Sequence, residues 1–394
     1  MDKAKKNVAL LSGCQALLLT NNSILIATNG LAGYALAADK ALATLPVTAY
    51  VVGAALTTMP ASLLMRRLGR RAGFTLGAVF GIVGALICAY AAFAYSFWML
   101  CAGSLVLGIY NATAQYYRFA AADSASADFK TRAISLVLAG GIIGGILGPE
   151  TSKVTKDLIA QAAFTGSFLS LGVFCVLAIG LLSLIDIPPL TAAEQKEAGR
   201  PLAVIAHQPV FLVAVLSAVV GYGVMSLLMT ATPLAMSASQ HPFSDAAFVI
   251  QWHVIAMFAP SFFTGTLIKR FGVLNVMLVG VVLSLGCVGF ALAGLEVMHF
   301  WLAMVLVGVG WNFMFIGGTT LLTECHTPPE RAKTQGANDM AIFITMAATS
   351  LSSGLLFTLQ GWELMNVLAV PFLLLAGSAM LWLAGTRRRA QIKA

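Results

Sequence analysis

The chain has 394 residues, of which 59% are hydrophobic and only 10% are charged. Soluble domains carry about 25% charged residues, so this composition excludes a soluble protein with a polar surface. The formal net charge of +8 would suggest an acidic partner if the basic residues shared one soluble face, but they are divided among loops, so nucleic acid is not implied. The sequence has no P-loop, nucleophile triad or zinc-site spacing, and it therefore gives no support to an enzyme.

Apolar runs of 18 residues or more, with few or no charges, recur along the chain. Such a run is long enough to cross a ~30 Å hydrocarbon core. Lipid requires the backbone hydrogen bonds to be satisfied within the segment, so each span is predicted to be a helix. The predicted helices lie near residues 8–36, 43–65, 73–94, 97–121, 133–155, 164–185, 209–235, 246–268, 273–294, 299–322, 335–358 and 365–385.

The longest polar stretch, residues 186–207, divides the predicted helices into six plus six. We therefore expect an N-terminal six-helix bundle at 1–190, a cytoplasmic central loop at 191–208 and a C-terminal six-helix bundle at 209–394. Basic residues follow the second, fourth, eighth and tenth helices and end the chain, whereas the other side carries only Lys40, Lys153 and Lys156. Because cytoplasmic loops of membrane proteins are rich in Lys and Arg, both termini are predicted to be cytoplasmic.

Short sequence segments of the first half recur in the second half about 200 residues later, which is typical of membrane proteins built by duplication. The matching segments are Arg66-Arg67-Leu68-Gly69 with Lys269-Arg270-Phe271-Gly272, Gly108-Ile109-Tyr110-Asn111 with Gly310-Trp311-Asn312, and Arg132-Ala133 with Arg331-Ala332.

Segment 62–71 resembles the loop between helices 2 and 3 of the major facilitator superfamily, whose pattern is G-x-x-x-D-R-x-G-R-R. Ser62 replaces the first glycine and Arg66 replaces the acid, and the matching residues are Arg67, Gly69, Arg70 and Arg71. The resemblance implies an all-α membrane protein with twelve transmembrane helices in two pseudo-symmetric six-helix bundles. It also implies transport by alternating access.

A run of small residues, Gly140 to Pro149, lies in the fifth predicted helix and permits close helix approach. It resembles the glycine and proline motif on helix 5 of many antiporters of the family. The alternative interpretation is a packing surface between the halves, so the run does not assign a direction of transport.

Helices 7 and 8 carry side chains that could bind a metal. The seventh contains Met225 and Met229, and the eighth contains His253 and Met257, each pair four residues apart and therefore on one helix face. Thioether sulfur and imidazole nitrogen favour a soft metal, above all copper. The alternative is core packing, since Met is a common filler of hydrophobic cores, but an ionisable histidine inside a span is a functional-site hypothesis by default.

The two motifs resemble those of CcoA-type copper importers, a branch of the same superfamily that carries M-x-x-x-M on helix 7 and H-x-x-x-M on helix 8. The resemblance implies that Met225, Met229, His253 and Met257 bind copper as transported substrate, with no cofactor. It further implies copper import across the bacterial inner membrane for assembly of cbb3-type cytochrome c oxidase. The expected partners are the copper ion, the lipid bilayer and cytoplasmic copper-handling proteins.

Two other functions compete with copper import. The first is a proton-coupled carrier of a small organic solute, in riboflavin-like vitamin uptake or drug efflux, and the second is a non-transporting scaffold or sensor for oxidase assembly. An organic solute would use polar side chains on helices 1, 4 and 10, namely Asn22, Tyr110, Asn111 and Asn312.

Two carboxylates are candidates for proton coupling, because an acid at membrane depth can take up a proton. They are Glu150, just past the proline of the fifth helix, and Asp339, near the start of the eleventh. The alternatives are an exposed loop acid for Glu150 and a structural partner of an arginine for Asp339.

Overall fold

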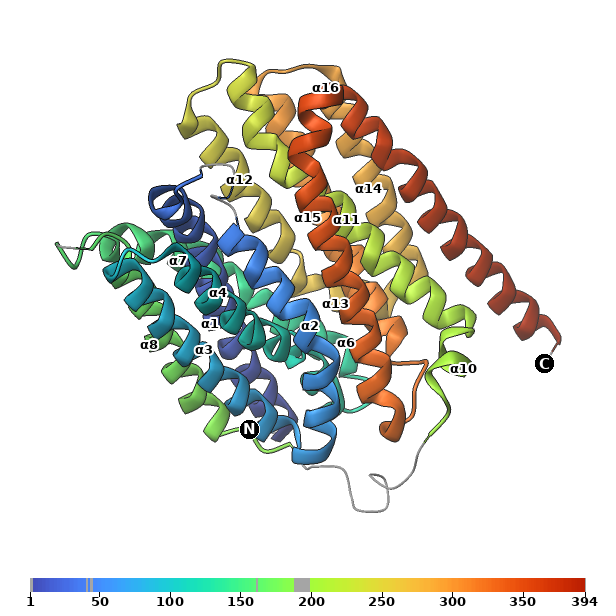
Figure 1. Cartoon of the computed structure of the whole chain (residues 1–394). Helices are drawn as coiled ribbons and strands as arrows, with labels where there is room; N and C mark the ends of the chain where they lie inside the picture. Colours follow the sequence, from blue (N-terminus) through green and yellow to red (C-terminus); the bar gives the residue numbers. More distant parts are fainter. Residues whose placement is uncertain (1–2, 40–41, 43–44, 161, 188–198, 394) are drawn as a thin grey trace. The chain divides into compact units, whose positions relative to one another are not determined.

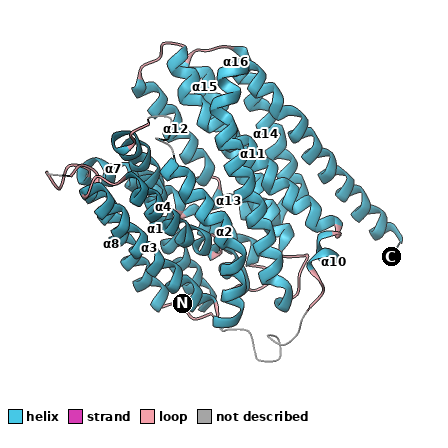
Figure 2. Ribbon diagram, viewed as in Figure 1, coloured by secondary structure: helices cyan, strands magenta, loops and turns pink. Residues whose placement is uncertain are grey.

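The computed structural model describes residues 3–39, 42, 45–160, 162–187 and 199–393. Over these residues the chain forms helices and loops and no β-strand (Figures 1 and 2). Lys40 and residues 191–198 of the predicted central loop lie outside the described residues.

The chain forms two compact units. The first comprises Met1–Ala198 and Gln335–Phe343, and the second comprises Gly199–Thr334 and Ile344–Ala394. The helices of the first unit are α1 (Lys3–Leu36), α2 (Leu45–Leu68), α3 (Arg70–Phe93), α4 (Phe97–Ala114), α5 (Tyr117–Ser124), α6 (Lys130–Ala139), α7 (Gly141–Thr155) and α8 (Thr165–Ser183). Those that begin in the second are α10 (Leu202–Ala206), α11 (Pro209–Ala238), α12 (Phe243–Phe258), α13 (Ser261–Phe271), α14 (Val273–Ala293), α15 (Val297–Leu322), the 3-10 turn η2 (Pro328–Glu330) and α16 (Arg331–Lys393).

The all-α membrane fold predicted from the sequence is confirmed. Among the described residues, ten helices are long and apolar enough to cross a membrane, and α12 with α13 makes an eleventh span if the bent pair is counted together. The last two predicted helices form α16, which is interrupted at Gly361, where φ is 73°.

Close helix approach in the first unit depends on glycine. A Cβ atom on Gly144 would lie 2.6 Å from the Cβ of Leu19, and one on Gly140 would overlap the carbonyl oxygen of Ser12. Real Cβ atoms do not approach so closely, so only glycine lets α7 pack on α1 in this way. The glycine run of the fifth predicted helix thus packs against α1 of its own unit.

The internal repeat is visible in the backbone. Gly69, which follows α2, and Gly272, which follows α13, both have φ of 86°. Glycine adopts a positive φ at no steric cost, because it has no Cβ atom. The two matching loops of the sequence therefore turn in the same way.

One segment of the second half of the chain belongs to the first unit. Residues 335–343, at the start of α16, are grouped with α1–α8. Gln335 accepts a hydrogen bond of 2.6 Å from the guanidinium of Arg70, and Gly336 lies so close to α2 that an added Cβ would be 2.8 Å from the Sδ atom of Met59. These contacts bring the carboxylate of Asp339 into the first unit.

Candidate functional site

A cluster of amide and hydroxyl side chains joins α1, α2 and α4 in the first unit. Asn22 donates to the Oδ1 atom of Asn111 at 3.4 Å, and the hydroxyl of Tyr50 donates to the Oδ1 atom of Asn22. Gln115 donates to the same Oδ1 atom of Asn111 at 3.3 Å. Asn22 and Gln115 are half-buried, whereas Tyr50 and Asn111 are 6% and 5% exposed. We call these four residues the amide cluster.

The amide cluster continues into a buried ion pair. Arg118 donates through Nη1 to the Oε1 atom of Gln115 at 3.1 Å and through Nη2 to the Oδ1 atom of Asp339 at 2.5 Å. Both charged side chains are only 2% exposed. Asn338 donates a further bond of 2.8 Å to Asp339. This environment matches the alternative interpretation of Asp339, a structural partner of an arginine, and a role of Asp339 in coupling stays a prediction.

A second buried pair holds the same segment. Arg70 contacts Asp123 at 3.0 Å, with the side chains 9% and 11% exposed, and also donates to Gln335. Arg70 of this pair lies in the segment that matched the superfamily pattern, where the acid expected at position 66 is replaced by Arg66. Asp123, at the end of α5, provides the carboxylate partner of Arg70.

Tyr110 of the predicted solute set lies outside the amide cluster, and so does Asn21, the neighbour of Asn22. Tyr110 is 2% exposed and packs against α3, where a Cβ atom on Gly81 would lie 3.1 Å from its own. Asn21 turns away from Asn22 toward α8 and donates to the carbonyl oxygen of Leu171 at 3.4 Å. Adjacent asparagines thus face different helices.

Asn312 holds the bend between α12 and α13 in the second unit. The two helices meet at an angle of 42° around Pro260, which cannot donate a backbone hydrogen bond. Asn312 donates to the carbonyl oxygen of Met257 and to the hydroxyl of Ser261, each at 2.6 Å, and accepts from Thr264 at 2.8 Å. Its side chain is fully buried, so it serves the bend of the helix pair.

His253 is fully buried on α12. Its Nδ1 atom lies 2.8 Å from the carbonyl oxygen of Met304 on α15. A carbonyl can only accept, so Nδ1 carries the proton and Nε2 keeps its lone pair. Nε2 has no hydrogen-bond partner in the described part of the chain.

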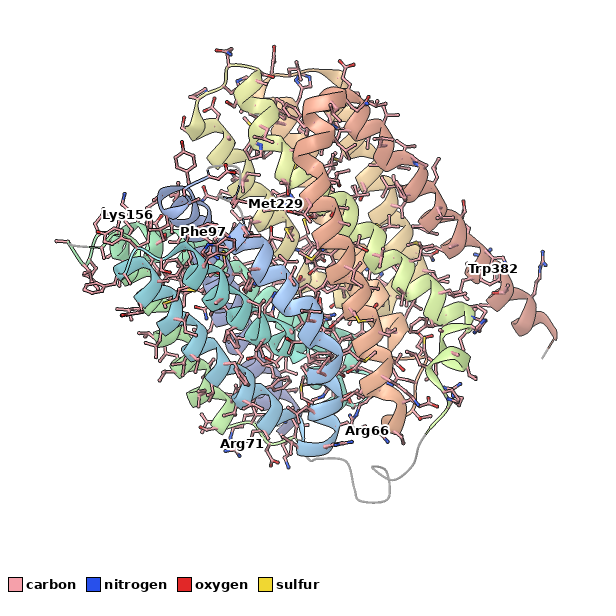
Figure 3. All side chains as sticks on the ribbon, viewed as in Figure 1. Arg66, Arg71, Phe97, Lys156, Met229 and Trp382 are labelled. Carbon is pink, nitrogen blue, oxygen red and sulfur yellow. The ribbon has the colours of Figure 1, made fainter. Side chains whose placement is uncertain are left out.

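Of the predicted methionines, Met257 lies on α12 with His253, and Met225 and Met229 lie on α11. Met225 and Met257 are 4% and 8% exposed, and Met229, labelled in Figure 3, is half-buried on α11. α11 and α12 each pack more extensively on α15 than on each other. Among the described residues, no group of three or more His, Cys, Asp or Glu side chains is placed to hold a metal ion.

Glu150 lies near the end of α7 and is exposed. It forms an ion pair of 2.7 Å with Lys153, and the two side chains are 61% and 70% exposed. This environment matches the alternative interpretation of Glu150 as an exposed acid, and a role of Glu150 in coupling stays a prediction.

Comparison with known proteins decides the family. The model of the Major Facilitator Superfamily matches residues 11–324 and 214–394. The chain belongs to the major facilitator superfamily. It is 44% identical over 374 residues to the riboflavin transporter RfnT of Brucella anthropi, covering 94% of each chain. It is thus a multi-pass membrane transporter.

Solved structures of the superfamily have the same fold. The human organic anion transporter MFSD10 (TETRAN) superposes with a TM-score of 0.78 at 14% identity, over 96% of this chain and 100% of that one. A bacterial homologue of the iron transporter ferroportin, in an outward-facing state, gives a TM-score of 0.75 at 12% identity, over 96% and 99%. At these identities the likeness concerns the fold.

The copper-importer interpretation is wrong. The chain is 44% identical over nearly its whole length to a protein named as a riboflavin transporter, which favours an organic solute. Whether Met225, Met229, His253 and Met257 bind a metal stays a prediction. Short motifs of Met and His are also common in apolar helices, and their spacing does not identify a tertiary partner.

Tyr50 and Arg118 belong to the site but were not predicted from the sequence. Arg118 had a readable signal, since an arginine within a predicted span needs a buried partner. Gln115 and Arg118 are three residues apart, so their contact was also readable. Tyr50 gave no signal, because a tyrosine in an apolar run is also typical of a membrane interface.

Proposed function

We propose that this protein is a proton-coupled carrier of a small organic solute of the riboflavin class, working by alternating access. The observation that carries the proposal is the 44% identity over 94% of the chain to the riboflavin transporter RfnT. At that identity and coverage the two chains share a whole transporter and not a single motif.

The amide cluster supports a polyhydroxylated solute. Riboflavin carries a chain of hydroxyl groups, each of which donates and accepts hydrogen bonds. Asn22 and Gln115 are half-buried and offer both amide donors and carbonyl acceptors. A site that hydrogen-bonds solute hydroxyls rejects analogues that lack them, because its own polar groups are then left unpaired.

Adjacent asparagines give a matched test of the proposal. Asn22→Ala removes a member of the amide cluster, whereas Asn21→Ala removes an amide that contacts α8. In a bacterial riboflavin auxotroph that lacks its own riboflavin carrier, we expect wild type and Asn21→Ala to support growth on low riboflavin. Asn22→Ala should raise the KM for labelled riboflavin about tenfold, the effect of losing roughly 1.4 kcal/mol of binding. Equal KM values for the two variants at equal protein levels would refute the assignment of the amide cluster.

Asp339 is the stronger of the two coupling candidates. Its carboxylate is buried against Arg118, whereas Glu150 is exposed and paired with Lys153. We propose that Asp339 takes up the coupling proton when its contact with Arg118 opens. Asp339→Asn should abolish uphill uptake driven by a proton gradient while riboflavin exchange persists, and loss of both activities or of neither would contradict this role.

The location follows from the same proposal. We infer the bacterial inner membrane with both termini cytoplasmic, because Lys and Arg follow alternate predicted helices. The relatives bear the names of transporters, so we expect no enzymatic activity and no bound cofactor.

A further inference from the structure

Six side chains of the first unit form one unbroken chain of hydrogen bonds. It runs in order through Tyr50, Asn22, Asn111, Gln115, Arg118 and Asp339. Every link is a contact between side chains, and the chain starts in the amide cluster and ends at the buried carboxylate of Asp339.

Gln115 links the amide cluster directly to the ion pair of Arg118 and Asp339. Its Nε2 atom donates to Asn111 at 3.3 Å, and its Oε1 atom accepts from Arg118 at 3.1 Å. Both atoms belong to one planar amide group, so they cannot turn independently. A change in one bond therefore changes the geometry of the other.

The backbone places Gln115 where such movement is possible. α4 ends at Ala114 and α5 begins at Tyr117, so Gln115 lies in the turn between them. Asn111 is one turn before Gln115 on α4, and Arg118 is three residues after it, so the three side chains follow one face across the break. A helix break of this kind can absorb a small rotation.

The oxygen atom at the centre of the network is shared. The Oδ1 atom of Asn111 accepts from both Asn22 and Gln115, at 3.4 and 3.3 Å. A carbonyl oxygen has two lone pairs, so a third donor displaces one of those present. A hydroxyl of a bound solute that donates to Asn111 thus competes with Gln115.

We propose that Gln115 is a positioning residue that couples occupancy of the amide cluster to the Arg118–Asp339 ion pair. A solute hydroxyl on Asn111 releases the amide of Gln115, which then withdraws its acceptor from Arg118 and loosens the contact with Asp339. Asp339 lies in segment 335–343, so solute binding and the attachment of that segment to the first unit become linked. The inference rests on the proposed function for the identity of the solute, but the link between Asn111 and Asp339 does not.

The link between Asn111 and Asp339 does not depend on the solute, and a double-mutant cycle on the free energy of unfolding in detergent tests it. Asn111→Ala and Asp339→Asn should be non-additive in the Gln115 protein and additive once Gln115→Leu is introduced, because interacting residues couple and independent ones do not. Additivity in both backgrounds would overturn the link whatever the solute is.

The coupling of solute binding to the Arg118–Asp339 pair is tested by equilibrium dialysis of the purified full-length protein with riboflavin. Asp339→Asn should change the riboflavin Kd at least fivefold, the lower end of usual allosteric coupling, and by less than twofold in the Gln115→Leu background. The matched control is Asp123→Asn, which breaks the pair with Arg70, the residue that donates a hydrogen bond to Gln335 of the same segment. Its effect on Kd should be the same in both backgrounds.

The outcomes separate the two proposals. If wild type binds riboflavin and Asp339→Asn changes Kd equally with and without Gln115, the coupling role of Gln115 is overturned and the proposed function stands. If wild type binds no riboflavin but the unfolding cycle depends on Gln115, the proposed function fails and the link between Asn111 and Asp339 stands.

Discussion

Removing Asp339 should destabilise the protein more than any change to a surface charge. The perturbation is Asp339→Ala, which leaves the guanidinium of Arg118 inside the first unit without its carboxylate. Both side chains are 2% exposed, and their charged atoms are 2.5 Å apart. Breaking a buried pair by removing one partner costs about 3–5 kcal/mol, because an uncompensated charge stays buried. That is a large part of the roughly 5–15 kcal/mol that stabilises a typical domain.

Replacing both partners should restore most of the stability. An apolar pair of similar volume avoids the desolvation of both charges, so Arg118→Met with Asp339→Leu is expected to lie within about 1–2 kcal/mol of wild type. Titration with SDS in mixed micelles measures these differences. Glu150→Ala is the control, since it removes an exposed ion pair and should give no measurable change.

Two results would refute this reasoning. One is an Asp339→Ala variant as stable as Glu150→Ala. The other is a double variant whose loss equals the sum of the two single losses, since that would mean that Arg118 and Asp339 do not interact in the folded protein.

Further predictions concern packing, the bent helix, pH and metal. Gly108→Ala places a Cβ against the carbonyl oxygen of Tyr50 and should lower the yield of folded protein, whereas Gly289→Ala, with nothing within 4 Å, should be neutral or stabilising by about 0.5–1 kcal/mol, as thermal denaturation would reveal. Asn312→Ala removes three hydrogen bonds at the α12–α13 bend and should cost about 2–3 kcal/mol in the same assay. The hydrogen bond from Arg200 lowers the pKa of Glu330 well below its ordinary value of 4.5. The Arg200–Glu330 pair therefore stabilises the folded protein fully above pH 4.5, and this contribution is lost as the pH falls below 4.5 and the carboxylate takes up a proton. A pH titration of stability should detect this loss. A copper chelator should leave riboflavin uptake unchanged, and inhibition that added copper reverses would revive a metal role.

Much of the fold could be predicted from the sequence, because the physics that decides it is local. Helix length and hydropathy follow from the thickness of the membrane core, and the described residues bear out an all-helical membrane protein. The duplicated glycines Gly69 and Gly272 even share one backbone conformation. The breaks at Gln115 and between α12 and α13 were not predicted, since hydropathy is continuous across both.

The candidate site was less predictable, because it depends on partners far apart in sequence. Asn22 and Asn111 were both candidates, yet their contact joins residues 89 positions apart. Arg118 and Asp339 are 221 positions apart, and the attachment of segment 335–343 to the first unit has no signature in local pattern. The Met and His motifs had the opposite property: their spacing was readable, but spacing alone did not identify the solute.

Transport by the purified protein in proteoliposomes tests the central proposal most directly. With an inward proton gradient, labelled riboflavin should accumulate saturably above its external concentration, Asn22→Ala should weaken this uptake, and labelled copper should not accumulate. Absence of riboflavin uptake by a folded wild-type protein, or accumulation of copper in its place, would contradict the account.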